Sequence, residues 1–140
     1  MMADTLSSER RSWNMSRIRG QNTGPEVRLR SLLHRAGFRF RLHAKELPGR
    51  PDIVLPRYRT AIFVHGCFWH RHAGCRNAST PSTRKAFWQE KFDGNVRRDE
   101  RNRSELVAAG WTVVVVWECE LAADPDLVVS RLAADLRRND

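Results

Sequence analysis

The 140 residues have the length of one ordinary domain, so we predict a single domain over residues 1–140. Lysine and arginine number 25 against 16 aspartate and glutamate residues, and the resulting net charge of +9 favours a polyanionic partner. The 41% of hydrophobic residues excludes a disordered basic tail, and no apolar run approaches the roughly 20 residues that span a bilayer. Residues 1–11 are polar and lack the apolar core of a secretory signal, so we expect a cytoplasmic protein without membrane attachment.

The first predicted elements are an arm or short helix within residues 1–22 and a helix over residues 23–37. Thr23 is a good helix N-cap, and Gly37 is a good residue to end the helix. Between them, four apolar residues follow the spacing that places side chains on one helix face. These are Leu29, Leu32, Leu33 and Ala36.

Three short strands are predicted next. Alternation of apolar residues with arginine predicts a half-buried strand over residues 38–42. Apolar runs predict buried strands over residues 52–55 and 60–64, and a turn joins them into a hairpin or meander. The Pro-Gly-Arg-Pro sequence at residues 48–51 interrupts regular structure before the hairpin.

The second half of the chain predicts a long helix over residues 84–109, a strand over residues 113–117 and a last helix that opens at Asp124. The strand is continuously apolar, so we expect it to be central and covered on both faces. This order of elements predicts an α/β fold with a mixed sheet between helices. The residues expected to face inward are Trp88, Phe92, Val96, Leu106 and Val107 on the long helix and Val128, Leu132 and Leu136 on the last.

Cysteines and histidines gather in residues 65–75, which hold two of the three cysteines and three of the five histidines. Two thiolates and an imidazole from this loop, with the third cysteine after the last predicted strand, form a Cys₃His set that suits tetrahedral zinc. Four protein ligands leave no open position, so this zinc would be structural. The alternative is a polar loop and an ordinary core cysteine. The predicted ligands are Cys67, His72, Cys75 and Cys119.

A second group of residues has the chemistry of hydrolysis. Asp52 opens one buried strand and His65 follows the next, so neighbouring strand ends are expected to bring them together. A carboxylate beside a backbone carbonyl suits magnesium, and a histidine such as His65 or His70 can take a proton from water near neutral pH. The alternative is that Asp52 only caps a turn after Pro51.

Aromatic residues interrupt the predicted zinc loop. A loop clamped by zinc cannot easily fold both Phe68 and Trp69 inward. An exposed aromatic pair on a basic protein can stack on nucleobases, at about 1–3 kcal/mol per base. The alternative is that one ring covers the core, and the helical pattern alone places Trp88 in the core as well.

Five motifs occur in order along the chain: LPGRPD at residues 47–52, FVHGCFWH at 63–70, FW at 87–88, NVRRD at 95–99, and a stretch from Gly110-Trp111 to the WEC triplet at 117–119. The HGCFWH string and the WEC triplet are specific. The set resembles the very-short-patch-repair DNA mismatch endonucleases, the Vsr family, and this resemblance runs from about residue 11 to residue 121.

The resemblance implies a restriction-endonuclease-like fold with a structural zinc site. It also implies Mg²⁺-dependent nicking of duplex DNA 5′ to the thymine of T:G mismatches, which arise when 5-methylcytosine deaminates and whose nicking initiates very short patch repair. The partner would then be double-stranded DNA containing a T:G mismatch, and mismatch-repair proteins are candidate partners. We expect a monomer that acts on DNA in the bacterial cytoplasm.

The resemblance further implies roles for single residues. Asp52 would bind Mg²⁺ together with the backbone carbonyl of Val64, and Glu26 would support the metal and its waters. His70 would be the general base, and His65 would lie near the scissile phosphate. The four predicted zinc residues match the family's zinc ligands. The residues implied to intercalate into DNA are Phe68, Trp69, Trp88 and, on the N-terminal arm, Met15.

The chain departs from the wider nuclease superfamily, in which Pro-Asp is followed by an acidic-x-Lys triplet. Residues 63–65 read Phe-Val-His instead, so histidine chemistry must replace the lysine. Two alternatives to T:G nicking stay open. One is a zinc-stabilised DNA-binding module without catalysis, which would not need Asp52, His65 or His70. The other is a nuclease of the same fold with a different DNA substrate.

Overall fold

The computed structural model describes residues 23–138, so the predicted N-terminal arm with Met15 lies outside the described residues. Helices and strands follow in the order that the sequence predicts, with one short helix added near the end. The elements are α2 (Gly24–Arg35), β1 (Arg41–Leu42), β2 (Ile53–Leu55), the 3-10 turn η2 (Pro56–Tyr58), β3 (Thr60–His65), α3 (Lys85–Ala108), β4 (Thr112–Trp117), α4 (Glu118–Ala123) and α5 (Pro125–Arg138).

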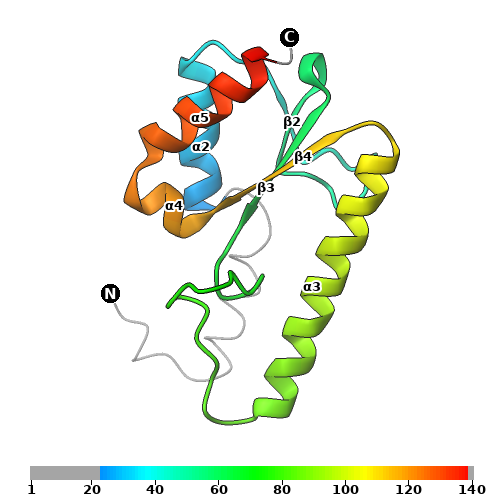
Figure 1. Ribbon diagram of the computed structural model, residues 1–140, viewed down its shortest axis with the longest axis vertical. Coiled ribbons are helices and arrows are strands. Elements are labelled where there is room, and N and C mark those ends of the chain that lie inside the picture. The colour runs from blue at the N-terminus through cyan, green and yellow to red at the C-terminus, as the bar shows by residue number, and fades with distance from the viewer. Residues whose placement is uncertain (1–22, 139–140) are drawn as a thin grey trace.

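The sheet is mixed and has the order β1-β2-β3-β4. The first three strands are antiparallel, and β4 runs parallel to β3, with His65 opposite Trp117 at the end of the pair. Figure 1 shows α2, α4 and α5 gathered on one side of the sheet and α3 on the other, extending well beyond the strands. The predicted class, a mixed sheet flanked by helices, is confirmed.

The core lies between the sheet and the group of α2, α4 and α5. Leu29 and Leu33 of α2 are fully buried, as their spacing predicts, and Leu132 and Leu136 of α5 pack into the same cluster. The N-cap is also confirmed, because the hydroxyl of Thr23 accepts a hydrogen bond from a backbone N–H of the first turn. This cluster fixes α2 against one face of the sheet.

The predicted central position of β4 is wrong. It is an edge strand of the described sheet, and Val116 is its one fully buried residue. A continuous apolar run indicates that other elements pack on both faces of a strand, and α3 and α4 both contact β4. It says nothing about how many strands pair with it, so the position in the sheet could not be read from the valines.

Two further expectations are wrong in detail. The predicted strand over residues 38–42 is reduced to two residues, and of its apolar residues Phe38 is buried in the core while Leu42 is exposed. On α3, Val96 and Val107 are 46% and 52% exposed although we placed them inward. The buried residues of this helix are Phe92 and Leu106, so of the adjacent Leu106 and Val107 only the first faces the core.

Helix α4 was not predicted. It is six residues long, too short to show a helical apolar period. Its N-terminus is capped by Glu120, whose carboxylate accepts a hydrogen bond from the backbone N–H of the N-cap residue Trp117 at 3.1 Å. Within residues 23–138, no helix combines the length and apolar character needed to cross a membrane.

Candidate active site and metal cluster

A cleft of about 1040 Å³ opens where β2 begins and β3 ends, with α2 and α3 contributing to its walls. All four residues predicted to act in catalysis line it: Glu26, Asp52, His65 and His70. The sheet register explains why, because Ile53 pairs with Ile62 and therefore places residue 52 across from residue 63. The expected proximity of Asp52 to the end of β3 is confirmed.

The LPGRPD motif places Asp52 directly before the start of β2. Gly49 has a φ of 76°, and a Cβ added there would lie 2.8 Å from the amide nitrogen of Asn102 on α3, so only glycine fits without a shift. The backbone N–H of Val64 donates to Asp52 Oδ2 at 2.7 Å. Burial raises the pKa of Asp52 to about 6, and the Val64 hydrogen bond opposes this rise.

Glu26 and His43 lie beside Asp52, and their ligand atoms are all within 4.8 Å of one another. Glu26 is only 1% exposed, and its Oε2 is 2.6 Å from His43 Nε2 and 3.3 Å from an Arg30 nitrogen. Two carboxylates facing one cleft provide the hard oxygen ligands that Mg²⁺ prefers. A bound cation would also offset the cost of burying the Asp52 charge, so these residues fit a divalent metal.

The two predicted catalytic histidines stack on each other. The rings of His65 and His70 are 3.8 Å apart and almost parallel, at 4°. His70 Nδ1 is 2.6 Å from Asp99 Oδ2 on α3, which makes Nε2 the basic nitrogen of this ring. Burial, reinforced by His70, lowers the pKa of His65 to about 4, so His65 is neutral at pH 7.

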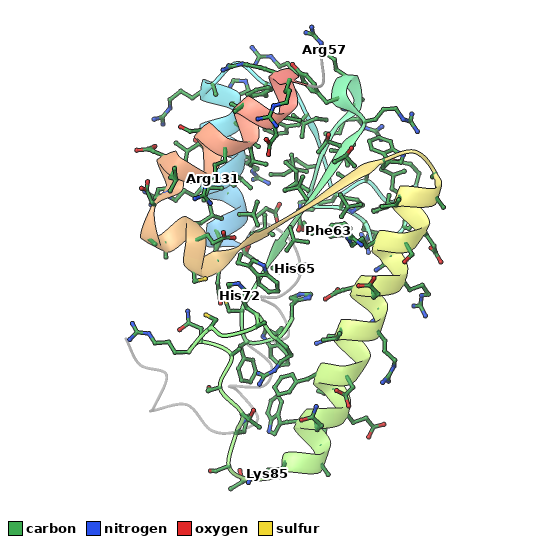
Figure 2. All side chains as sticks on the ribbon, in the orientation of Figure 1. Arg57, Phe63, His65, His72, Lys85 and Arg131 are labelled. Carbon is green, nitrogen blue, oxygen red and sulfur yellow. The ribbon has the colours of Figure 1, made fainter. Side chains whose placement is uncertain are left out.

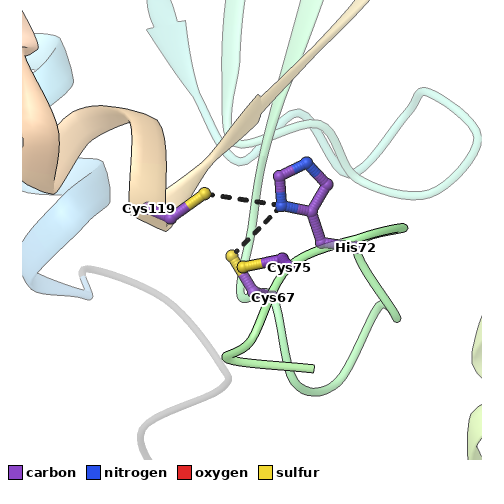
Figure 3. Close-up of side chains that lie close together, drawn as sticks. All are labelled: Cys67, His72, Cys75 and Cys119. Carbon is purple, nitrogen blue, oxygen red and sulfur yellow. Dashed lines mark hydrogen bonds between the residues drawn. The ribbon is translucent and has the colours of Figure 1, made fainter. Parts of the chain in front are cut away.

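The four predicted zinc residues form one cluster (Figure 3), with all ligand atoms within 4.8 Å of one another. His72 Nδ1 is 3.6 Å from Cys67 Sγ and 3.4 Å from Cys119 Sγ. Tetrahedral zinc with ordinary bond lengths separates sulfur and nitrogen ligands by about 3.6 Å. Burial raises the pKa of Cys67 to about 12, so its thiolate needs a cation nearby. The cluster could hold zinc.

The WEC triplet supports this cluster with three consecutive residues. The ring of Trp117 stacks on the His72 ring at 4.2 Å and 9°. Glu118 accepts a hydrogen bond from the Cys67 backbone N–H at 3.0 Å, and Cys119 brings the fourth candidate ligand from the start of α4. Figure 2 shows His72 close to His65, the last residue of β3, so the cluster lies next to the two stacked histidines of the cleft.

The three predicted intercalating rings within the described residues meet in one group. Phe68 is 5.1 Å from Trp69 and 5.8 Å from Trp88, and the two tryptophan rings are 5.8 Å apart. All three side chains are partly buried, and Phe68 and Trp69 line the cleft. Asn95 on α3 donates to the Trp69 carbonyl at 3.1 Å, which ties the loop to the helix. Trp88 is therefore neither a fully buried core residue nor fully exposed.

Two residues of the cleft were not predicted. His43 follows β1, and its backbone N–H donates to the Asp52 carbonyl, so strand pairing places it beside the carboxylates. Its proximity to LPGRPD in the sequence was the available signal. Asp99 stands in a run of arginines, which is typical of a solvated helix face, and its position at the end of the NVRRD motif was the available signal.

Comparisons with known proteins agree with this geometry. A family model described as "DNA mismatch endonuclease Vsr" matches residues 3–77. A type II nicking enzyme of Xanthomonas oryzae pv. oryzae is 54% identical over 121 residues, which is 86% of this chain and 88% of that protein. The DNA mismatch endonuclease Vsr of Escherichia coli is 49% identical over 120 residues, covering 86% of this chain and 76% of that protein.

A type II nicking enzyme of Neisseria meningitidis is 44% identical over 120 residues, covering 86% of this chain and 85% of that protein. These relatives are named as endonucleases or nicking enzymes, which decides against a DNA-binding module without catalysis. The mixed sheet between helices agrees with the restriction-endonuclease-like fold of the family. The chain therefore belongs to the Vsr family of DNA mismatch endonucleases and is a nuclease.

Proposed function

We propose that this nuclease nicks duplex DNA 5′ to the thymine of a T:G mismatch, with Mg²⁺, and so initiates very short patch repair. The observation that carries the proposal is that two carboxylates, the His70–Asp99 pair and the rings of Phe68 and Trp69 share one cleft. A relative at 49% identity bears the name of a mismatch endonuclease. Within this proposal the chain acts as a monomer, and mismatch-repair proteins are its candidate partners.

The substrate side of the proposal rests on charge and on the rings. The net charge of +9 and the cleft residues Arg50, Lys91 and Arg98 favour a phosphate backbone. Phe68, Trp69 and Trp88 would enter the base stack beside the mismatch, with Met15 of the N-terminal arm. Unstacking a base step costs a few kcal/mol, and the cost is lowest at a mispaired base. These inserted rings, the wedge, would therefore favour a mismatch.

The metal would be held by Asp52 and the Val64 backbone carbonyl, with Glu26 supporting its waters. When bound, Mg²⁺ supplies charge neutralisation for the phosphate and for the leaving 3′ oxygen. His70 would accept a proton from the attacking water at Nε2, because Asp99 holds its Nδ1. His65, neutral at pH 7, would contact the scissile phosphate.

Zinc in the Cys₃His cluster would have a structural role. Cys67 and Cys75 lie on the loop that carries Phe68, Trp69 and His70, whereas Cys119 belongs to α4. A closed four-ligand site would hold this loop against the sheet. The general base and the wedge would then keep a fixed separation, which nicking at a defined phosphate requires.

The test is a strand-specific nicking assay with Mg²⁺ on duplexes that differ at one base pair. The set contains T:G, T:C and A:C mismatches, the matched T:A pair, and a branched junction, each in several sequence contexts. We expect a single nick 5′ to the thymine of T:G and little cleavage of the others. Equal cleavage of all duplexes would reject T:G selectivity and favour a nuclease with another DNA substrate.

A further inference from the structure

The indole ring of Trp117 lies between a zinc-cluster residue and a catalytic histidine. It stacks on the His72 ring at 4.2 Å and meets the His65 ring edge-on at 5.3 Å. His65 in turn stacks on His70 at 3.8 Å. Four rings therefore form a continuous series from the Cys₃His cluster to the proposed general base.

Backbone pairing fixes the middle of this series. His65 and Trp117 are direct partners in the parallel pair of β3 and β4. Both strands lead into the cluster just after this pair, since Cys67 follows His65 by two positions and Cys119 follows Trp117 by two. A shift of the cluster relative to the strand ends would therefore displace the Trp117 ring, which stacks on His72.

His65 depends on these ring contacts for its position. Among residues 23–138, the structure gives its side chain no hydrogen-bond partner, and the side chain is held between the rings of Phe63, His70 and Trp117. His70, in contrast, has the 2.6 Å hydrogen bond to Asp99. Loss of the Trp117 ring would leave His65 without one side of its packing while Asp99 still orients His70.

We propose that Trp117 is a positioning residue that sets the His65–His70 stack and makes its geometry depend on the occupied Cys₃His cluster. The catalytic part of this inference rests on the proposed function, whereas the coupling between the rings does not. Trp117 touches neither DNA nor metal in this account and acts through His65. The zinc cluster then does more than stabilise the fold, because it also sets the position of a histidine in the cleft.

The test compares Trp117→Leu and Trp117→Phe with a matched control, Trp111→Leu. Trp111 immediately precedes β4 at its other end, where its ring packs under the Arg59 guanidinium at 4.8 Å, far from the cluster along the strand. Zinc content and thermal melting check that each variant is loaded and folded. Steady-state kinetics on a T:G duplex give kcat and KM, and side-chain NMR of ¹³C-labelled histidines gives the His65 and His70 resonances.

For Trp117→Leu we expect full zinc content, shifted His65 and His70 resonances, and a kcat at least tenfold lower with KM within twofold of the parent value. Trp117→Phe, which keeps a ring, should be intermediate in both readouts. Trp111→Leu should match the parent. Parent-like histidine resonances and kcat in Trp117→Leu would overturn the proposal, and if that variant loses zinc, the same comparison with Trp117→Phe decides.

A second measurement tests the dependence on the cluster without relying on activity. Replacing zinc by the larger Cd²⁺ should move the His65 resonance in the parent protein. The same replacement in the Trp117 variant that binds a full complement of zinc should leave the His65 resonance nearly unmoved. Equal movement in both proteins would contradict coupling through Trp117. If the resonances respond as expected but the parent does not nick T:G, the positioning role stands and the proposed function fails.

Discussion

Asp99 Oδ2 lies 2.6 Å from His70 Nδ1, and the two residues come from different elements, α3 and the loop after β3. A carboxylate at Nδ1 selects the tautomer with a free Nε2 and stabilises the charged ring after it takes a proton. The proposed general base therefore depends on how α3 docks against the cleft.

Replacing Asp99 tests this dependence. Asp99→Asn keeps the side-chain size but removes the charge and no longer selects the tautomer. We expect kcat for T:G nicking to fall about 100-fold or more, with mismatch binding nearly unchanged. The control is Asp93→Asn on the same helix, an exposed residue bonded to Gln89. A parent-like kcat in Asp99→Asn would remove Asp99 from the mechanism.

The raised pKa of Asp52 predicts an effect on the free energy of unfolding that depends on pH. Its pKa is raised to about 6 in the folded protein from 3.8, so ionised Asp52 opposes folding above pH 6. Without Mg²⁺, Asp52→Asn should raise the free energy of unfolding at pH 7 by up to about 3 kcal/mol. The gain should disappear as pH falls from 6 to 4, because folded Asp52 then takes a proton.

Urea unfolding of both proteins across pH 4–8 measures this difference. The lowered pKa of His65 weakens the fold as pH falls, from 6.5 towards about 4, but it does so in both proteins and cancels in the comparison. A gain that is the same at pH 4 and pH 7 would show that charge burial at Asp52 is not its cause.

His43 predicts an effect on metal binding. Its Nε2 lies 2.6 Å from Glu26 Oε2 and holds that carboxylate towards Asp52. We expect His43→Ala to raise the half-saturating concentration of Mn²⁺, followed by electron paramagnetic resonance, about tenfold, and His43→Gln, which keeps an N–H donor, to restore most of the affinity. His34→Ala, an exposed histidine on α2, is the control. Unchanged Mn²⁺ binding in His43→Ala would exclude this role.

Cys119 predicts a loss of stability. A structural zinc site contributes folding free energy, and Cys119 is the proposed ligand that would join α4 to the loop. Cys119→Ala should lose zinc by elemental analysis and lower the midpoint of thermal unfolding by many degrees. Freshly purified parent protein without zinc would contradict the prediction at its first step.

The sequence predicted those parts of the site that depend on local chemistry and strand ends. The Cys₃His set was predicted because three ligands lie close in the chain, and Asp52 because it opens a buried strand. The α2 helix carried both its cap and its apolar period. These predictions agree with the structure because they depend on nearby residues and not on contacts with distant segments.

The rest depends on contacts between distant segments. His43 reaches the carboxylates through pairing of β1 with β2, and Asp99 reaches His70 through the docking of α3. The edge position of β4 is decided by which strands pair, which its valines do not encode. Leu106 is fully buried while its neighbour Val107 is 52% exposed, because adjacent residues point in different directions on a helix, and an apolar pair does not tell which of the two faces the core.

The most direct measurement compares the parent protein with Asp52→Ala on one T:G duplex, in the same preparation and at saturating Mg²⁺. Nicking is followed on denaturing gels, and binding is measured separately on the same duplex. We predict a nick 5′ to the mismatched thymine with the parent, and with Asp52→Ala no detectable nick but nearly unchanged mismatch binding. Retained nicking by Asp52→Ala would show that the cleft described here is not where the bond is cut.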